Sequence, residues 1–519
     1  MSTVQTSEFV YRCASSGRLC YILSALNCLD RNPTATMYIF IFPLLSFTCL
    51  LVIYIYAVDL AGKLRNAKVR HIGRYECNRP QKTVTVGMVF TGKEPNAEKI
   101  LKEKIILEQV IFDGVSKTKH SALVSLCSHL FSASNLKDLA NRAVTLKKYM
   151  EDISMFQDIS IDVTASNKTF NGVNVIMKVK EPKRFLLHAG AGINSINETS
   201  SYMQLAWRNA FGSGELLKSS ISVCQEMKAM FDFDFAKPFL SVLNSGMRFN
   251  IYRKLRPLSQ CSGISNDVGA SIEFRHGLWK NWIYSLCLID CWRHFKTSSD
   301  VFLVREHAGH SVKNSVENSL IYCTLNNMLM PTSGSFFKLS QELAGGSGDV
   351  NFIRHSLDLK TNFQLPFNLI NANSFSFNHV IANSPRTLLC MDRMFLGGSQ
   401  NLRGFAPNCI GCQTNGHCLG GSSSVCFVAH LYRRIFGDFL YAHAFAAVGS
   451  LWYAPVSLEL SKLVKELSTG RRRSSVGMGL LFKIGSFCRI EINYCFPLEY
   501  QIEDKIHRGL QVGAGVSFL

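Results

Sequence analysis

From residue 185 to the end of the chain, apolar and polar residues alternate with a period of two. The stretch RIEINYCF (489–496) shows the pattern, and the shorter runs 248–251 and 337–343 repeat it. Such alternation places apolar side chains on one face of a strand and polar side chains on the other. Short clusters of Gly, Asn and Ser separate the runs, and one short helix is expected at 457–467. The region therefore predicts a long series of strands with one apolar face.

The length of this region distinguishes two kinds of sheet. A soluble sandwich rarely runs so long as one domain, whereas a transmembrane barrel needs strands of about 9–11 residues that face lipid and lumen in turn. At about 21 residues for each strand and its connection, the region supplies about sixteen strands. Closing such a sheet removes the edges that lipid cannot hydrogen-bond. We expect residues 183–519 to form an all-β transmembrane barrel of about 16 antiparallel strands.

Residues 84–182 have a different pattern, typical of a small α+β domain. The expected order is strand, helix, helix, strand, strand, with an insert between the two helices. The expected elements are a strand at 83–90, helices at 97–110 and 135–150, the insert near 111–132, and strands around 159–163 and 173–179.

Residues 1–83 form an N-terminal extension with one uncharged apolar run at 37–58. The run is long enough to cross a bilayer as a helix, and basic residues flank it. It starts too far into the chain, and is too long, for an ordinary cleaved signal peptide. A buried apolar stretch, or an extension absent from the mature protein, is the alternative. We expect a transmembrane helix at 37–58.

The charge balance is basic, with 56 Lys and Arg against 37 Asp and Glu and a formal net charge of +19. The excess is spread along the chain, and Arg471, Arg472 and Arg473 form its one basic block, so we expect no nucleic-acid partner. The sequence has no G-x-S-x-G, H-E-x-x-H or P-loop motif, and its histidines and acids do not cluster at a catalytic spacing. We therefore expect neither an enzyme nor a cofactor.

The densest group of cysteines and histidines is Cys409, Cys412, His417 and Cys418. These four residues could offer ligands to zinc. The alternative is a set of ordinary loop cysteines, and no second C-x-x-C or spaced histidine pair accompanies the group. We favour loop cysteines and expect no metal.

The segment MDRMFLGGSQNLRGFAPNCIG (391–411) combines a glycine pair with the tetrad LRGF. Its residue chemistry alone fits a surface loop with a solvated arginine. It occurs together with NAFGSGE (209–215), QELAGGSGDVNFI (341–353), RIEINYCFPL (489–498) and GLQVGAGVSFL (509–519). With these stretches, residues 84–519 resemble the outer-membrane-protein assembly superfamily, most closely the barrel subunit of the mitochondrial sorting and assembly machinery. Residues 84–182 then resemble a POTRA domain, and room for only one such domain favours the mitochondrial branch.

The resemblance implies that the LRGF segment folds back into the barrel lumen. There a planar guanidinium can meet several lumen-facing polar groups. The residues of this lumen-loop motif are Gly397, Gly398, Leu402, Arg403, Gly404 and Phe405. Relatives often place an acidic or amide partner for the arginine in the strand that corresponds to 445–450, where this chain has Ala447 and Val448. Glu491 is our substitute candidate, and the alternative is that Glu491 is an ordinary hydrated lumen residue.

The resemblance also implies a function, the insertion of β-barrel precursor proteins into the mitochondrial outer membrane. The first strand (185–193) and the last strand (511–519) would meet at a lateral gate. Glycines at Gly190, Gly192, Gly513 and Gly515 would leave this seam short of side-chain packing. The implied partners are precursor proteins, peripheral subunits of a sorting and assembly complex, and outer-membrane lipid, with the POTRA-like domain in the intermembrane space. A passive or protein-conducting channel is the alternative function.

The last residues also fit the sorting signal of mitochondrial barrel proteins, in which a polar residue, a glycine and two hydrophobic residues recur at fixed spacing. Here these positions are Gln511, Gly513, Val516 and Phe518. An ordinary amphipathic last strand is the alternative, because the pattern is loose. The match at the end of a long barrel pattern favours the signal.

Overall fold

The computed structural model describes the POTRA-like region from residue 103 and most of the barrel. The described residues are 103–166, 169, 171–193, 199–224, 229–279, 281–382, 388–411, 413–452, 472–484 and 488–515. The apolar run 37–58 and the expected short helix 457–467 lie outside them, as do the expected strand 83–90 and residues 97–102 of the first expected helix. None of the helices in the described part combines the length and the apolar character that a membrane span requires.

The small N-terminal unit is a three-stranded sheet with two helices. Its elements are β1 (Ile106–Asp113), α5 (His120–Cys127), α6 (Leu136–Asp152), β2 (Asp158–Ala165) and β3 (Gly172–Lys180). The strand order is β1-β3-β2, with β1 parallel and β2 antiparallel to β3. Apolar side chains such as Leu139, Leu146 and Met177 are fully buried between the helices and the sheet.

The expected helix at 97–110 is wrong over its described part. Residues 106–110 belong to strand β1, and the first described helix, α5, lies inside the expected insert 111–132. The order strand, helix, helix, strand, strand occurs, but with different segments in its first two places. The physical reason is tertiary, because β1 pairs in parallel with β3 from Ile106–Gly172 to Asp113–Lys178. Pairing with a strand some sixty residues away outweighs a local helical periodicity.

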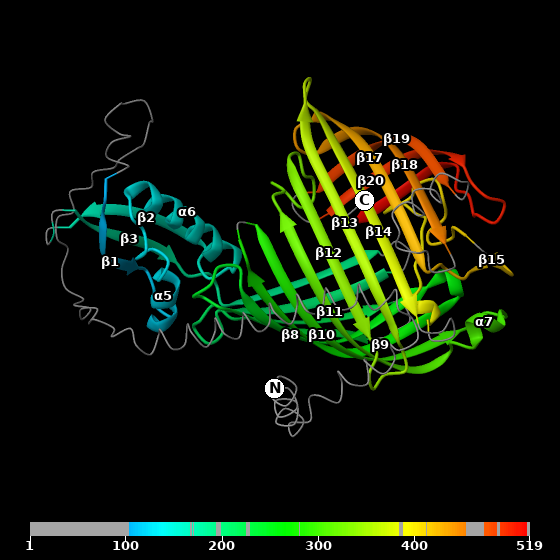
Figure 1. The fold of residues 1–519 in the computed structure, drawn as a ribbon, viewed down its shortest axis with the longest axis horizontal. Coiled ribbons are helices and arrows are strands. Elements are labelled where there is room, and N and C mark those ends of the chain that lie inside the picture. The colour runs from blue at the N-terminus through cyan, green and yellow to red at the C-terminus, as the bar shows by residue number, and fades with distance from the viewer. Residues whose placement is uncertain are drawn as a thin grey trace, which may run out of the picture. The chain divides into compact units, whose positions relative to one another are not determined.

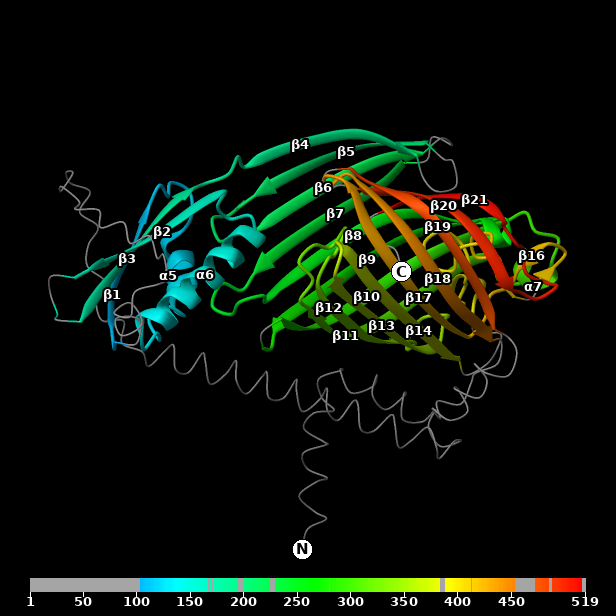
Figure 2. The same ribbon diagram turned by 90° about the horizontal axis from the view of Figure 1, so that it is seen from above.

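Sixteen strands of the remaining described chain form one sheet, so the prediction of about sixteen antiparallel strands is confirmed. The strands are β4 (Phe185–Ile193), β5 (Thr199–Arg208), β6 (Leu216–Cys224), β7 (Ala229–Pro238), β8 (Gly246–Leu258), β9 (Gly263–Gly277), β10 (Trp282–Thr297), β11 (Gly309–Cys323), β12 (Gly334–Ala344), β13 (Phe352–Leu365), β14 (Leu369–Ala382), β17 (Ser423–Phe436), β18 (Leu440–Trp452), β19 (Arg473–Ile484), β20 (Cys488–Glu499) and β21 (Gly509–Gly515). Each strand pairs antiparallel with its neighbour in this order, and the sheet curves from β4 round to β21 (Figures 1 and 2).

Short elements lie in the connections between these strands. They are η2 (Ser259–Cys261), α7 (Phe302–Arg305), η4 (Cys390–Asp392), and the two-residue strands β15 (Gln413–Thr414) and β16 (His417–Cys418). The long connection between β14 and β17 contains η4, β15 and β16, and it carries the LRGF tetrad.

The two faces of the barrel sheet have the polarity expected of a membrane wall. On β20, Glu491 and Asn493 are fully buried, whereas Tyr494 and Phe496 are exposed by 49% and 47%. On β20 this arrangement is the reverse of that in a soluble protein, because polar side chains face inward and apolar side chains face outward. The outward face is suited to lipid, and the inward face provides the polar groups that the connection between β14 and β17 meets.

Candidate functional site

The connection between β14 and β17 packs against the inward faces of β17, β18 and β20. Leu402 and Phe405 are fully buried in a cluster with Val428, Phe445 and other wall residues. We call residues 388–411 the lumen loop. The structure thus brings the LRGF tetrad inside the barrel, where an isolated reading of its residues had suggested a surface loop.

A tight turn presents the tetrad. Gly397 and Gly398 both adopt left-handed backbone conformations, with φ of 110° and 113°. The Gly398 N–H donates to the Leu402 carbonyl at 3.1 Å, and the Asn401 side-chain oxygen accepts from the N–H groups of Gly397 and Leu402. A Cβ at Gly397 would lie 2.6 Å from the Ala406 carbonyl oxygen, so the turn needs glycine there for space as well as for φ.

Arg403 is fully buried and reaches the inward face of β20. Its Nη2 lies 2.9 Å and its Nε 3.3 Å from Oε2 of Glu491, whose side chain is also fully buried. Its Nη1 lies 3.3 Å from Nε2 of His430 on β17. Both charges lose their hydration in this buried setting, so removing either partner would leave the other as an uncompensated buried charge.

Glu491 serves two arginines at once. Arg489, two residues earlier on the same face of β20, donates from Nε to Glu491 Oε1 at 2.7 Å. Its Nη2 donates to the Tyr432 hydroxyl at 2.9 Å, and Asn493 Nδ2 donates to Glu491 Oε2 at 3.1 Å. One carboxylate therefore balances two buried guanidinium groups. Sequence reasoning missed Arg489 as a site residue, although its place on the polar face of β20 was visible.

The β18 wall opposite Arg403 is apolar. Ala447 is buried in the cluster with Leu402, and the Arg403 guanidinium carbon lies 5.2 Å from the centre of the Phe445 ring. A cation over an aromatic face is attracted to the ring electrons. This chain therefore presents an aromatic face to Arg403 on β18, and the acidic partner of Arg403 lies on β20.

A second buried ion cluster holds the start of the lumen loop. Nη1 of Arg293 on β10 donates to both carboxylate oxygens of Asp392, at 2.9 and 3.0 Å. Lys313 on β11 lies 3.9 Å from the same carboxylate, and Arg354 on β13 donates to the Asp392 carbonyl at 2.9 Å. Burial raises the pKa of Asp392, but the charges of Arg293 and Lys313 outweigh it and hold that pKa below its ordinary value.

A third cluster holds the end of the loop against the connection between β20 and β21. Asp504 in this connection accepts from Nε of Arg473 at 2.9 Å and from the Gly411 N–H at 2.8 Å. The two backbones also pair, because the Ala406 N–H donates to the Lys505 carbonyl and the His507 N–H to the Gly404 carbonyl, each at 2.9 Å. Sequence reasoning missed Asp392 and Asp504, which carry no local motif.

The two edge strands of the barrel sheet are β4 and β21. In the ranges that the structure describes, no ladder joins them, and each pairs only with its neighbour in the chain. Gly190 and Gly192 lie on β4, and Gln511, Gly513 and Gly515 lie on β21, whereas Val516 and Phe518 fall outside the described residues.

The expectation that the seam glycines lack side-chain packing between β4 and β21 stays a prediction, and Gly190 has a separate role toward β5. A Cβ there would lie 2.8–2.9 Å from atoms of the Tyr202 ring on β5. The glycine makes room for a cross-strand aromatic side chain, which covers the backbone at this point.

The cysteine and histidine group is only partly described, because Cys412 lies outside the described residues. The thiols of Cys409 and Cys418 are hydrogen-bonded to each other. In the described ranges, no three His, Cys, Asp or Glu side chains are placed to hold a metal ion.

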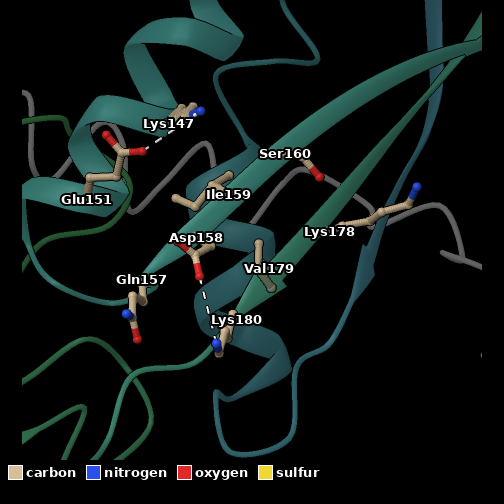
Figure 3. A pocket seen from close by; sticks show the side chains of 9 residues that line it. All are labelled: Lys147, Glu151, Gln157, Asp158, Ile159, Ser160, Lys178, Val179 and Lys180. Atoms are coloured by element: carbon tan, nitrogen blue, oxygen red, sulfur yellow. Dashed lines mark ion pairs between the residues drawn. The ribbon is translucent and has the colours of Figure 1, made fainter. Parts of the chain in front are cut away.

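An open depression of about 470 Å³ lies on the small unit, between α6 and the strands β2 and β3 (Figure 3). Four of its charged side chains pair with one another, Lys147 with Glu151 and Lys180 with Asp158, each at 4.0 Å and well exposed to solvent, and Lys178 pairs with Asp162 at 3.0 Å. Such pairs are solvated surface contacts, so this depression offers no reactive group.

Comparisons with known proteins agree with this architecture. The human protein named sorting and assembly machinery component 50 homolog is 28% identical over 448 residues, which cover 83% of this chain and 94% of that protein. A SAM50-like protein of Drosophila melanogaster is 26% identical and covers 80% of this chain and 95% of its own. Among solved structures, BamA from Haemophilus ducreyi lacking POTRA domains 1–3 is similar in fold, with a TM-score of 0.62 at 16% identity, covering 79% of this chain and 84% of that one. The family model of the Omp85 superfamily domain matches residues 209–518. Because this match spans more than half of the sequence, the chain belongs to the Omp85 superfamily.

Proposed function

We propose that this protein inserts and assembles β-barrel precursor proteins into the mitochondrial outer membrane. Relatives named as sorting and assembly machinery components, similar over four fifths of the chain, support this role. The main support is that the two edge strands of the sheet do not pair with each other in the described residues. In the described residues β4 and β21 share no ladder, while the lumen loop holds the connection that leads into β21.

The proposed mechanism is strand addition at this seam. An edge strand presents backbone N–H and C=O groups, and within a bilayer these groups have no water to bind. An incoming precursor strand would satisfy them by pairing along the edge. Backbone pairing and the transfer of apolar side chains into lipid favour the product, so the step needs no nucleotide, cofactor or catalytic residue.

The barrel would be integral to the mitochondrial outer membrane, with the small unit in the intermembrane space and residues 37–58 as an additional span. Peripheral subunits of a sorting and assembly complex, barrel precursors and outer-membrane lipid would be its partners.

The small N-terminal unit and the in-folded LRGF tetrad count against a simple metabolite porin, which needs neither. Leu402, Arg403 and Phe405 are fully buried against one part of the inner wall. A channel would also keep the seam shut, and this difference allows a direct test.

The test ties the seam after the barrel has assembled. One cysteine is introduced at successive positions of 186–190 in β4 and another at positions of 509–513 in β21, and a short bismaleimide joins the closest pair. The tied protein should keep its folded mobility on a gel but stop inserting radiolabelled precursors into mitochondria. Leu186→Cys with Ala206→Cys, which face each other across the β4–β5 ladder, is the matched control and should not affect insertion. The double-cysteine variant without bismaleimide and the wild-type protein with bismaleimide are the further controls. They show any effect of the substitutions and of the native cysteines. Normal insertion by the tied barrel would refute lateral opening and favour the channel.

The C-terminal sorting signal is part of the proposal and has a separate test. Phe518→Asp should block assembly of this protein itself, because a charge on the expected lipid-facing side opposes insertion. Integration into carbonate-resistant membranes measures this effect, and normal integration of the variant would exclude a signal role for Phe518.

A further inference from the structure

Four free cysteines from two distant connections lie together at one end of the barrel. Cys261 is in η2, between β8 and β9, whereas Cys390, Cys409 and Cys418 belong to the long connection between β14 and β17. Each strand of the sheet is antiparallel to its neighbour, so β8 and β14 run in the same direction and their connections emerge at the same end. The topology therefore brings the four thiols into one region.

The thiols form two pairs that touch each other. The Cys261 thiol is hydrogen-bonded to that of Cys390, and the Cys409 thiol is hydrogen-bonded to that of Cys418. The pairs meet at Cys261, whose Sγ also lies 3.6 Å from the carbonyl oxygen of Cys418. In the part of the chain that the structure describes, no three of these side chains surround a common metal position. The arrangement suits bonds between paired sulfurs better than it suits metal ligation.

The two pairs differ in their access to solvent. Cys261 and Cys390 are buried, with exposures of 0% and 3%, and Cys418 is buried beside them. Cys409 is partly exposed, so it is the thiol that a dissolved molecule meets first. The hydrogen bond with Cys418 and the nearby charge of Lys505 lower the pKa of Cys409 to about 7. A large share of Cys409 is therefore thiolate at neutral pH, and the thiolate is the nucleophile in disulfide exchange.

We propose that these four cysteines form a thiol–disulfide relay, which under oxidising conditions ties the start of the lumen loop to the connection between β8 and β9. The co-substrate is a low-molecular-weight disulfide such as glutathione disulfide. The product is a buried disulfide between Cys261 and Cys390, and the oxidant never has to reach that buried pair.

The relay consists of balanced exchange steps. The Cys409 thiolate attacks one sulfur of glutathione disulfide and releases one glutathione thiolate. Cys418 loses its proton, attacks the Cys409 sulfur and releases the second glutathione, which closes the Cys409–Cys418 disulfide. Cys261 then attacks the Cys418 sulfur and releases Cys409, and Cys390 attacks the Cys261 sulfur and releases Cys418. The released thiolates take up the protons that the attacking thiols lost, so two protein thiols are oxidised and one glutathione disulfide is reduced to two glutathiones.

The buried pair has a defined direction of attack. The hydrogen bond with Cys390 lowers the pKa of Cys261 below its ordinary value, whereas the pKa of Cys390 is raised. Cys261 is therefore the member of this pair that attacks the outer disulfide.

The buried disulfide would act on the lumen loop. Cys390 lies two residues before Asp392, whose carboxylate is held by Arg293, so the new bond would add a covalent anchor beside the ion cluster. A bond between Cys261 and Cys390 also closes a long segment of chain, which restricts the unfolded state. In the proposed orientation this end of the barrel faces the cytosol, because β14 runs in the same direction as β4 and ends away from the small unit. Disulfides in a reducing cytosol are transient and typical of redox sensing.

The experiment uses the full-length protein refolded in lipid vesicles and equilibrated with mixtures of reduced and oxidised glutathione. Free thiols are blocked with N-ethylmaleimide, and disulfides are mapped by mass spectrometry. Oxidation should give Cys261–Cys390 and Cys409–Cys418, and it should raise the urea midpoint of unfolding until dithiothreitol reverses both changes. Alkylation of Cys261 and Cys390 as free thiols in oxidised glutathione would overturn the inference. A disulfide of Cys409 with Cys412 in place of Cys418 would also overturn it.

Variants test the order of the steps. Cys409→Ser should slow formation of the Cys261–Cys390 disulfide roughly tenfold or more, because the remaining thiols of the relay are buried. Cys390→Ser should leave formation of the Cys409–Cys418 disulfide at the wild-type rate. Cys323→Ser is the matched control, since it removes a half-buried thiol on β11, and it should leave both rates unchanged.

Heat-modified mobility on a gel shows whether each variant folds, and the corresponding alanine variant replaces any serine variant that does not. Formation of the Cys261–Cys390 disulfide at the wild-type rate in Cys409→Ser would overturn the relay. Disulfide mapping does not use precursor insertion, so its result is independent of the proposed function.

Discussion

Replacing Arg403 with alanine should destabilise the barrel and release the lumen loop. The change removes a fully buried guanidinium that lies 2.9 Å from the buried carboxylate of Glu491. Breaking a buried ion pair by removing one partner costs about 3–5 kcal/mol. In the variant the Glu491 carboxylate still accepts hydrogen bonds from Arg489 and Asn493. Its charge is therefore partly compensated, and we expect the lower part of that range. Loss of the contact with the Phe445 ring adds about 1–2 kcal/mol. We therefore expect a total loss of about 4 kcal/mol in the free energy of unfolding.

The shared carboxylate predicts an order among variants. Glu491→Gln removes the counter-charge of both Arg403 and Arg489, so it should cost more than Arg403→Ala. Arg403→Lys keeps the charge but not the planar fork, so it should cost less than the alanine change. A double-mutant cycle of Arg403→Ala with Glu491→Gln should give a coupling of at least about 1 kcal/mol, because the two side chains are in direct contact.

Denaturant unfolding of the refolded protein in lipid vesicles, followed by tryptophan fluorescence, measures these changes. Heat-modified mobility on a gel reports whether each variant folds. The matched control is Arg472→Ala, which removes the same charge from an exposed pair with Glu499 and should leave the unfolding midpoint unchanged. An Arg403→Ala midpoint equal to wild type would refute the reasoning, as would a Glu491→Gln variant that is milder than Arg403→Ala.

Three further predictions follow from the site. Asp504→Asn should cost about 3 kcal/mol in the same unfolding assay, because it breaks a buried ion pair, whereas Glu499→Gln, in an exposed pair, should change little. Gly397→Ala should lower the yield of folded barrel on a heat-modification gel, since its Cβ would meet a backbone oxygen at 2.6 Å. The hydrogen bond to a neighbouring thiol lowers the pKa of Cys409 to about 7, whereas burial raises the pKa of Cys127 to about 12. Alkylation at pH 8 followed by mass spectrometry should therefore label Cys409 and spare Cys127. Labelling of Cys409 should fall as the pH drops below 7, because its thiolate is then protonated. Equal labelling of the two cysteines at pH 8 would contradict this.

The alternating pattern determined the barrel sheet and its two faces. A period of two fixes which side chains share a face, so the sequence alone placed Glu491 and Gln511 on the polar side and Tyr494 on the apolar side. Strand number followed from length, because a membrane of constant thickness limits each strand to a similar span. The sequence also predicted Arg403 and Glu491 as candidate partners, and the structure places Nη2 of Arg403 2.9 Å from Oε2 of Glu491.

Tertiary structure decided what local pattern could not. Residues 106–110 have a helical periodicity, yet they form β1 because a parallel partner from β3 is available across the small unit. Asp392 and Asp504 lack any motif and acquire their roles only when distant strands bring Arg293 and Arg473 to them. The contact of Gln511 with Gly404 and Phe405 joins residues more than a hundred positions apart. Backbone periodicity is a local property of the chain, whereas the partner of a buried charge or carboxamide is chosen by whichever distant group can satisfy it without water.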